Sequence, residues 1–196
     1  DEIDGVAAAP DGSAWLTGKF ERTATLAGTE LVSAGQADIP LARIEPDGDV
    51  AFVHSFGGPG EDNLFDLAAD ERGALGTGWF TGTIEFDDVT LTSEGSTDCV
   101  VVAFDPEGGV RWARSFGGPG PDGCNEVSLG HDGEITTSMD TAGGWTSPAG
   151  ELDASEDRDT LLMRLDRSGE LEWGRVADGA GAQRGKAIAV AEDGTV

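Results

Sequence analysis

The chain has 196 residues, of which 38% are hydrophobic, so it is long enough to form one ordinary domain with a real core. Its 38 acidic and 12 basic side chains give a net charge of −26, and a surface of that sign repels the phosphates of nucleic acids. No apolar run approaches the roughly 18 residues of a membrane helix. We therefore expect neither a nucleic-acid partner nor insertion into a membrane.

An internal repeat of about 60 residues organises the sequence. The phrase SFGGPG occurs at 55–60 and again at 115–120, and the phrases around it recur with it. Further matched pairs are LTGKF with GTGWF, at 16–20 and 76–80, and SAGQAD with SEGSTD, at 33–38 and 93–98. A fixed period of this length indicates one supersecondary unit stacked on its copies.

Each repeat begins with two short runs that favour strands. The first run is rich in small apolar residues and lies at 6–9, 67–69, 127–129 and 188–191. A turn follows it, most often with Asp-Gly, which is a strong hairpin signal because glycine tolerates a positive φ. The second run lies at 14–20, 74–80 and 134–139.

The second half of each repeat holds a small hairpin and two further strands. The hairpin is clearest at 83–86 and 89–93. The third strand is the most apolar and lies at 39–44, 99–104 and 160–165. Because 99–104 has no polar face, this strand must be covered on both sides. A turn then leads to a fourth strand, in which Phe52, Trp112 and Trp173 share one position.

Four antiparallel strands per repeat, with the third covered on both faces, predict the blades of a β-propeller. The expected fold is therefore all-β, a partial β-propeller of four-stranded antiparallel blades spanning 1–196. The blades are expected at 1–60, 61–120 and 121–181, with the start of a fourth at 182–196. Propellers close with four to eight blades, so we expect a fragment whose partners include the remaining blades. An array of β-sandwiches is the alternative, which explains the extra hairpin but not the doubly covered third strand.

The order of these motifs resembles the bacterial beta-propeller repeat of secreted and cell-surface proteins, which is commonly described as seven-bladed. The motifs are SFGGPG, TG-x-F and S-x-G-x-x-D in the first two repeats. The third repeat departs from them, with VADGAG at 176–181 and TTSMD at 136–140. The resemblance implies an extracellular or surface-displayed β-propeller and supplies no catalytic residues. We expect these residues to be an internal fragment, so the lack of a signal peptide within them carries no meaning.

Two sets of aspartates recur at matched positions in the repeats. Asp38, Asp98 and Asp159 precede the third strands, and Asp1, Asp62 and Asp122 precede the first strands. Both sets are expected on one rim of the propeller. A ring of carboxylates there is a candidate site for Ca²⁺, since hard cations prefer clustered oxygens. The structural alternative, which recurrence favours, is that each carboxylate accepts backbone N–H groups in a glycine-rich turn. The acidic segment 153–159 is expected to be a solvated loop rather than a calcium loop.

The aromatic residues that vary between repeats are candidates for a ligand surface. Trp79 and Trp145 are the less repetitive tryptophans, so a protein or carbohydrate ligand is expected near them if either is accessible. The alternative is that they fill gaps between blades. His54, Arg114 and Arg175 share a position beside the ring of the fourth strand and are expected to stack on it or form ion pairs. With His131 in a turn as the other histidine, no catalytic triad is credible.

The two cysteines permit one disulfide. Cys99 opens a third strand and Cys124 precedes the first strand of the next blade. Their Cα atoms are expected to lie beyond the roughly 7 Å limit for a bridge, so two buried thiols are expected and a disulfide is the alternative.

The sequence therefore predicts a non-enzymatic binding or scaffold module. The alternatives are an extracytoplasmic enzyme with its active site in the propeller channel or in another domain, and a structural adhesin or stalk element. SFGGPG is expected to shape the crossing between blades, with Gly57, Gly58, Gly117 and Gly118 as its structural positions. Function is expected first beside 176–181, where the symmetry of the repeat breaks.

Overall fold

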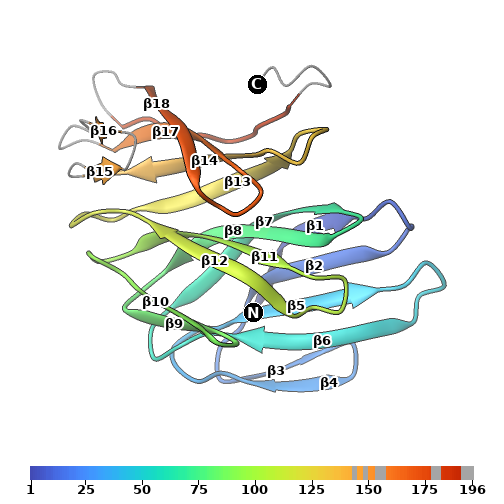
Figure 1. Ribbon diagram of the computed structural model, residues 1–196. Coiled ribbons are helices and arrows are strands. Elements are labelled where there is room, and N and C mark those ends of the chain that lie inside the picture. Colours follow the sequence, from blue (N-terminus) through green and yellow to red (C-terminus); the bar gives the residue numbers. More distant parts are fainter. Residues whose placement is uncertain (143–144, 148–149, 153–157, 178–181, 191–196) are drawn as a thin grey trace.

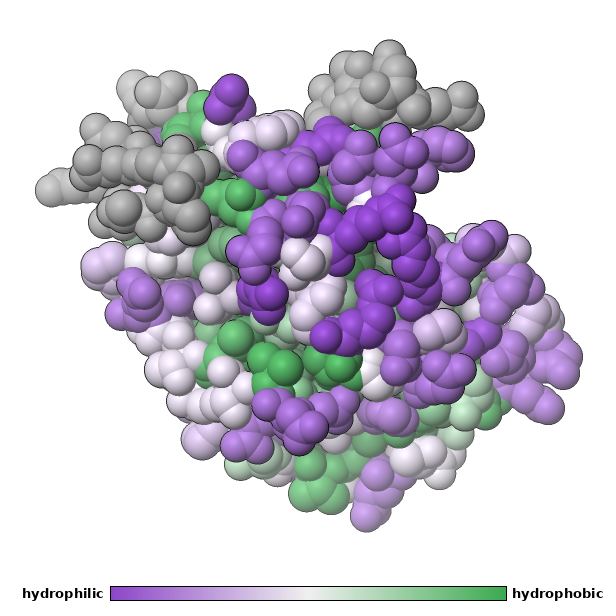
Figure 2. All heavy atoms as spheres, in the orientation of Figure 1, coloured by the Kyte–Doolittle hydropathy of each residue, from purple (hydrophilic) through white to green (hydrophobic). Residues whose placement is uncertain are grey.

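The computed structural model describes residues 1–142, 145–147, 150–152, 158–177 and 182–190, and within these ranges the chain is all-β. Three four-stranded antiparallel sheets follow one another along the chain, and each has a two-stranded hairpin beside it (Figure 1). The face seen in Figure 2 is mostly hydrophilic, in keeping with the net charge of −26. The described residues include no helix with the length and hydrophobicity to span a membrane.

The three sheets have the same strand order, in which chain order equals spatial order apart from the inserted hairpin. Sheet one contains β1 (Glu2–Ala8), β2 (Ala14–Lys19), β5 (Ile39–Ile44) and β6 (Val50–Phe56). Sheet two contains β7 (Asp62–Asp70), β8 (Gly73–Phe80), β11 (Asp98–Phe104) and β12 (Val110–Phe116). Sheet three contains β13 (Gly123–Leu129), β14 (Ile135–Thr141), β17 (Asp159–Leu165) and β18 (Leu171–Ala177). The hairpins are β3 (Thr23–Leu26) with β4 (Thr29–Val32), β9 (Thr83–Phe86) with β10 (Val89–Thr92), and β15 (Trp145–Ser147) with β16 (Gly150–Leu152). The expected four antiparallel strands per repeat are confirmed.

Turns with a glycine at positive φ close the hairpins within each sheet. Between β11 and β12, the carboxylate of Asp105 accepts the N–H groups of Glu107 at 3.0 Å and Gly109 at 2.8 Å. Gly108 takes a φ of 87°, which a residue with a side chain adopts only with strain. The local sequence therefore fixes where each strand ends.

The third strand of the middle sheet is covered on both faces, as its composition predicts. Every residue of β11 is buried, and Cys99 and the five residues after it are fully so. In β17 the pattern alternates between buried and half-buried residues, because no further described sheet covers the far face of sheet three.

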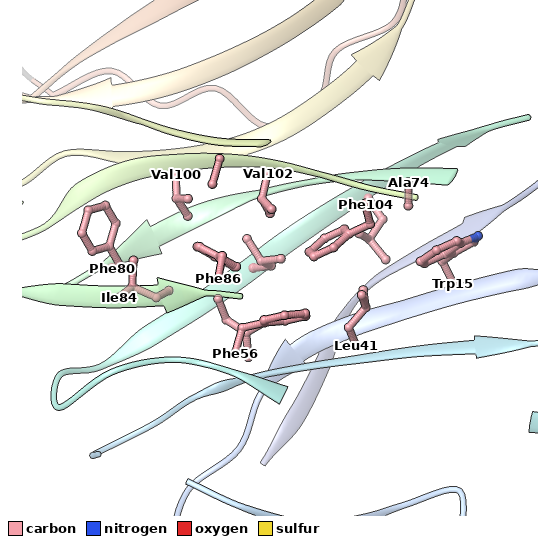
Figure 3. Close-up of a cluster of buried hydrophobic side chains, with 14 of the residues drawn as sticks. Trp15, Leu41, Phe56, Ala74, Phe80, Ile84, Phe86, Val100, Val102 and Phe104 are labelled. Atoms are coloured by element: carbon pink, nitrogen blue, oxygen red, sulfur yellow. The ribbon is translucent and has the colours of Figure 1, made fainter. Parts of the chain in front are cut away.

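Neighbouring sheets make their main contacts through the first strands, β1 with β7 and β7 with β13. The fourth strands spread apart, and the hairpin β9–β10 lies between β6 and β12. Phe86 of that hairpin lies 5.5 Å, centroid to centroid, from Phe56 of β6, and Phe56 lies 5.5 Å from Phe104 of β11 (Figure 3). The hairpin thus fills the widening gap with hydrophobic side chains.

A β-bulge interrupts the first strand of every sheet at the same place. The register shifts between Ile3 and Gly5, between Leu64 and Asp66, and between Cys124 and Glu126. Each first strand continues on both sides of its bulge. The first strands are therefore longer than predicted and begin several residues earlier. The pattern misses this half of the strand because a bulged residue breaks the alternation of inward and outward side chains.

Two sequence expectations are wrong. Residues 188–190 form no strand, and residue 191 of that predicted run lies outside the described residues. The segment 182–190 instead meets sheet three, where the N–H of Gln183 donates to the carbonyl of Arg158 at 2.7 Å and the N–H of Gly185 donates to Asp140 Oδ1 at 3.4 Å.

The second wrong expectation is that of two free thiols. Cys99 and Cys124 form a disulfide with their Cα atoms 4.9 Å apart. Sheets two and three pack closely enough for β13 to contact both β8 and β11, so the lateral step between sheets is shorter at this end than the expectation assumed.

Candidate functional site

A cavity of about 360 Å³ lies between the ends of sheets two and three, and we call it the Trp79 cleft. Phe65 of β7 and Trp79 of β8 form one side of it. The other residues that define it here are Asp122, which precedes β13, Asn125 of β13, Asp140 of β14, Arg158, Arg184 and Lys186. Its volume falls within the range of about 300–1,000 Å³ that is typical of small-molecule sites.

The strand register explains why these side chains gather at one place. Phe65 and Asn125 are the bulged residues of two successive first strands, and a bulge re-aims the side chain that it carries. Trp79 pairs with Asn63 next to the first bulge, and Asp140 pairs with Gly123 next to the second. The cleft is therefore built where the bulged ends of neighbouring sheets meet.

Both positions differ from one repeat to the next. The bulged residue is aspartate at 4, phenylalanine at 65 and asparagine at 125, and its neighbour on the second strand is Lys19, Trp79 or Asp140. The aspartate three residues before the bulged residue, by contrast, is kept as Asp1, Asp62 and Asp122. Positions that keep one residue in every repeat are those that stacking of the repeats requires, so positions that vary between repeats can serve another role.

The aromatic side of the cleft is partly accessible. The Phe65 and Trp79 rings lie 6.4 Å apart between centroids and are tilted by 56°. Both side chains are half-buried, whereas Trp15 in the core is only 1% exposed. Gly123 lies against Trp79, where an added Cβ would be 3.4 Å from the Trp79 Cβ.

The two carboxylates of the cleft are already engaged by the protein. Asp122 accepts the N–H of Gly118 at 2.7 Å and of Ala142 at 3.3 Å. Asp140 Oδ1 accepts the hydroxyl of Thr160 at 3.0 Å and the N–H of Gly185 at 3.4 Å. These contacts hold both acids in place and engage both oxygens of Asp122 but only the Oδ1 atom of Asp140.

The three cations of the cleft are differently placed. Within the described residues, Arg158, Arg184 and Lys186 form no ion pair with a carboxylate. Arg184 and Lys186 are exposed and Arg158 is half-buried. The Nδ2 atom of Asn125 is buried and lacks a hydrogen-bond partner among the described residues. The cleft therefore offers donors and positive charge.

Trp79 and Trp145, the two candidate ligand residues, lie in different environments. Trp145 is 8% exposed, and its ring meets that of Phe116 edge-on with the centroids 5.9 Å apart. It belongs to the hydrophobic cluster between sheets two and three. The structure places only Trp79 in the cleft.

The paired aspartates lie at the crossings between sheets. Asp62 Oδ2 accepts the N–H of Gly58 at 2.8 Å, and Asp38 Oδ2 accepts that of Ala34 at 2.8 Å. At the next crossing Asp98 Oδ2 accepts the N–H of Glu94 at 3.1 Å, in parallel with the bond from Gly118 to Asp122. Asp159 is buried at the start of β17. These are the bonds that a structural role predicts.

Glycines of SFGGPG make room for these carboxylates. A Cβ on Gly57 would overlap the Asp38 carboxyl group, and one on Gly117 would lie 2.7 Å from Cγ of Asp98. The two carboxylates of a crossing are close enough to interact. Burial raises the pKa of Asp62 to about 7, with the charges of Asp38 and Glu61 as further causes. Burial likewise raises the pKa of Asp38 and of Asp98.

A calcium site in the carboxylate ring stays a prediction. The described residues contain no group of three or more histidine, cysteine, aspartate or glutamate side chains arranged to hold a metal ion. Residues 153–157 of the acidic segment lie outside the described residues.

The recurrent basic residue of the fourth strand lies against the ring beside it. Arg114 Cζ lies 5.9 Å from the centroid of Trp112, Arg175 Cζ lies 5.8 Å from that of Trp173, and the His54 ring lies 4.9 Å from that of Phe52. Arg114 also forms a 3.2 Å ion pair with Glu170 of the next repeat. This position links and covers neighbouring sheets.

Sequence reasoning found Trp79 and Asp122 but missed the rest of the cleft. A signal for Phe65 and Asn125 exists in the repeat itself, since both differ from the matched Asp4 at a position three residues after a kept aspartate. Arg184 and Lys186 lie three and five residues after the irregular stretch 176–181, beside which function was expected first.

The chain matches no protein-family model and no curated protein sequence. Its resemblance to beta-propeller repeats therefore rests on its motifs, and its function has to be argued from the geometry of the cleft.

Proposed function

We propose that the chain is a non-enzymatic binding or scaffold module of a secreted or surface-displayed bacterial β-propeller and that its ligand occupies the Trp79 cleft. The three sheets are its blades. In support, each sheet is a four-stranded meander, the first strands contact one another, and the fourth strands spread apart. Remaining blades, which would complete the ring, are partners of the same propeller.

One observation carries the binding function. Four positions at which the repeats differ, 65 and 79 in one sheet and 125 and 140 in the next, meet in a single cavity. Stacking of blades needs residues that recur, and these residues do not. A ligand site is the role that convergent, non-recurring residues in a concave site indicate.

The disulfide supports an extracytoplasmic location. Cys99 and Cys124 are the two cysteines of the chain, and they are bonded to each other across two sheets. Structural disulfides form and persist mainly in oxidising compartments. The strong net negative charge favours solubility, which a secreted or surface-displayed protein also requires.

Binding at the cleft is tested by mapping a fragment library onto the protein by NMR. We expect fragments to shift the indole N–H signal of Trp79 in preference to those of the other tryptophans. A variant carrying the residues of the first repeat, Phe65→Asp with Trp79→Lys, should keep the dispersed spectrum and lose the hits. Hits that gather elsewhere, or that survive in this variant, contradict the proposal.

An enzyme is the second candidate, and one pair of residues favours it. Glu126 of β13 has its pKa raised by burial and by the neighbouring carboxyl group of Asp66 on β7. Carboxyl groups with shifted pKa values often act as acids or bases. Mass spectrometry of bound ligands after prolonged incubation separates the two: intact ligand supports a binding module, and turnover that Glu126→Gln abolishes supports an enzyme.

A further inference from the structure

We propose that the Trp79 cleft binds a sugar ring bearing a carboxylate, such as a uronic acid unit of an acidic oligosaccharide. This inference rests on the proposed binding function and names its ligand class. Three features of the cleft carry it: a partly accessible aromatic wall, polar groups that line the cavity with it, and cations that form no ion pair among the described residues.

The aromatic wall fits the C–H face of a sugar ring. Trp79 and Phe65 are half-buried, line the cavity, and belong to adjacent strands of one sheet. Large rings that remain partly accessible supply apolar contact area and a flat surface. A wall of this kind offers little to a small inorganic anion, which has no apolar face.

The opposite side offers hydrogen bonds to hydroxyl groups. Asn125 Nδ2 is a buried donor without a partner in the described chain, and a donor of this kind costs free energy until it is satisfied. Asp140 also faces the cavity, and only its Oδ1 atom accepts the hydrogen bonds described above. An amide beside a carboxylate can both donate to and accept from a sugar hydroxyl.

The cations select for negative charge. The chain has only 12 lysines and arginines against 38 acids, yet three of the 12 line this one cavity. The other lysine, Lys19, pairs with Glu2 at 3.2 Å, whereas Lys186 forms no ion pair among the described residues. The acids that line the cleft are held by backbone and hydroxyl donors and form no ion pair with these cations among the described residues. Guanidinium groups bind carboxylates in a bidentate manner.

Neither feature alone explains the cleft. A neutral sugar would form no ion pair with the cations, and an inorganic anion would make no apolar contact with the aromatic wall. A nucleic acid would bring many phosphates against a chain of net charge −26. A carboxylate on a sugar ring uses both the wall and the cations.

The test is isothermal titration and NMR mapping of the 196-residue chain with three probes. Trigalacturonate is the acidic probe, its methyl ester is the neutral match, and citrate is a polyanion without a sugar ring. The variants are Trp79→Ala and the double variant Arg184→Gln with Lys186→Gln. Their matched controls outside the cleft are Trp173→Ala and the double variant Arg111→Gln with Arg167→Gln, and a dispersed spectrum is required of all.

We expect trigalacturonate to shift the signals of the cleft and the ester to bind about tenfold more weakly or worse. Trp79→Ala should weaken both sugars about tenfold. The cationic double variant should weaken only the acidic sugar, again about tenfold, while both controls stay within about twofold of the original affinity.

Three results overturn the inference. Equal binding of the acid and its ester, lost in Trp79→Ala, means a neutral-sugar site and leaves the binding function standing. Citrate binding as tightly as trigalacturonate, with no effect of Trp79→Ala, means a simple anion site. Absence of shifts with all three probes rejects the ligand class, and fragment hits at Trp79 then still support binding, whereas their absence rejects both.

Discussion

We predict that Asp62 makes the protein lose stability as the pH rises from mildly acidic to mildly alkaline. Its carboxyl group is fully buried at the crossing between sheets one and two, beside Asp38. Burial raises its pKa to about 7 from an ordinary value of 3.8. The folded state therefore binds the Asp62 proton more tightly than the unfolded state does. The stability that this proton contributes is fully present below the unfolded pKa and is lost as the pH rises through about 7.

The size of the effect follows from these two pKa values. Each unit of difference corresponds to about 1.36 kcal/mol between the two protonation states. Between about pH 5 and about pH 8, the linkage relation gives a loss of roughly 2 to 3 kcal/mol in the free energy of unfolding from Asp62 alone. Asp38 and Asp98, whose pKa values are also raised by burial, act in the same direction.

Urea unfolding at the two pH values measures this loss, and Asp62→Asn should reduce it by roughly 2 to 3 kcal/mol. Asp166→Asn is the matched control. The hydrogen bond from Ser168 lowers the pKa of the Asp166 carboxyl, so its titration is complete below this range and its removal should lower stability equally at both pH values. If the original chain and Asp62→Asn lose the same stability, Asp62 does not titrate in this range and the reasoning is wrong.

Two further predictions concern how sheets two and three are held together. Replacing Cys99 and Cys124 by serine should lower the free energy of unfolding by about 3 to 4 kcal/mol, because the unfolded chain regains the entropy of a loop of 25 residues. Urea midpoints that stay the same after this replacement or after addition of a reductant would contradict this prediction. Gly117→Ala should cost about 1 to 3 kcal/mol because its Cβ would lie 2.7 Å from Cγ of Asp98. Gly123→Ala, whose Cβ meets Trp79 at an ordinary 3.4 Å, is the control, and an equal loss in both variants in thermal unfolding would refute the crowding argument.

Strands bounded by local signals were predictable from the sequence. The turn at Gly108 and the continuous apolar run of β11 identify their strands without reference to the rest of the chain. The bulges at Phe65 and Asn125 were not, because a bulge depends on how two strands pair and leaves only a gap in the alternation. This is why the first strands were predicted too short.

The disulfide and the cleft depend on how whole sheets pack. Cys99 and Cys124 meet because β13 lies across β8 and β11, a spacing that no local pattern encodes. The cleft joins Trp79 with Arg184 and Lys186, which come from a segment that was expected to begin another sheet. The aromatic residue Trp79 could be predicted from the sequence, whereas the basic residues Arg184 and Lys186 could not.

The disulfide also changes how the chain would carry mechanical load. When the two ends are pulled apart, tension passes from Cys99 to Cys124 through the sulfur atoms, so the residues between them, including all of β12, are shielded. For a separation of 25 residues, roughly 85 Å of extended chain is withheld from lengthening. Reduction would release that length, so the redox state of the surroundings sets how far the molecule can be stretched.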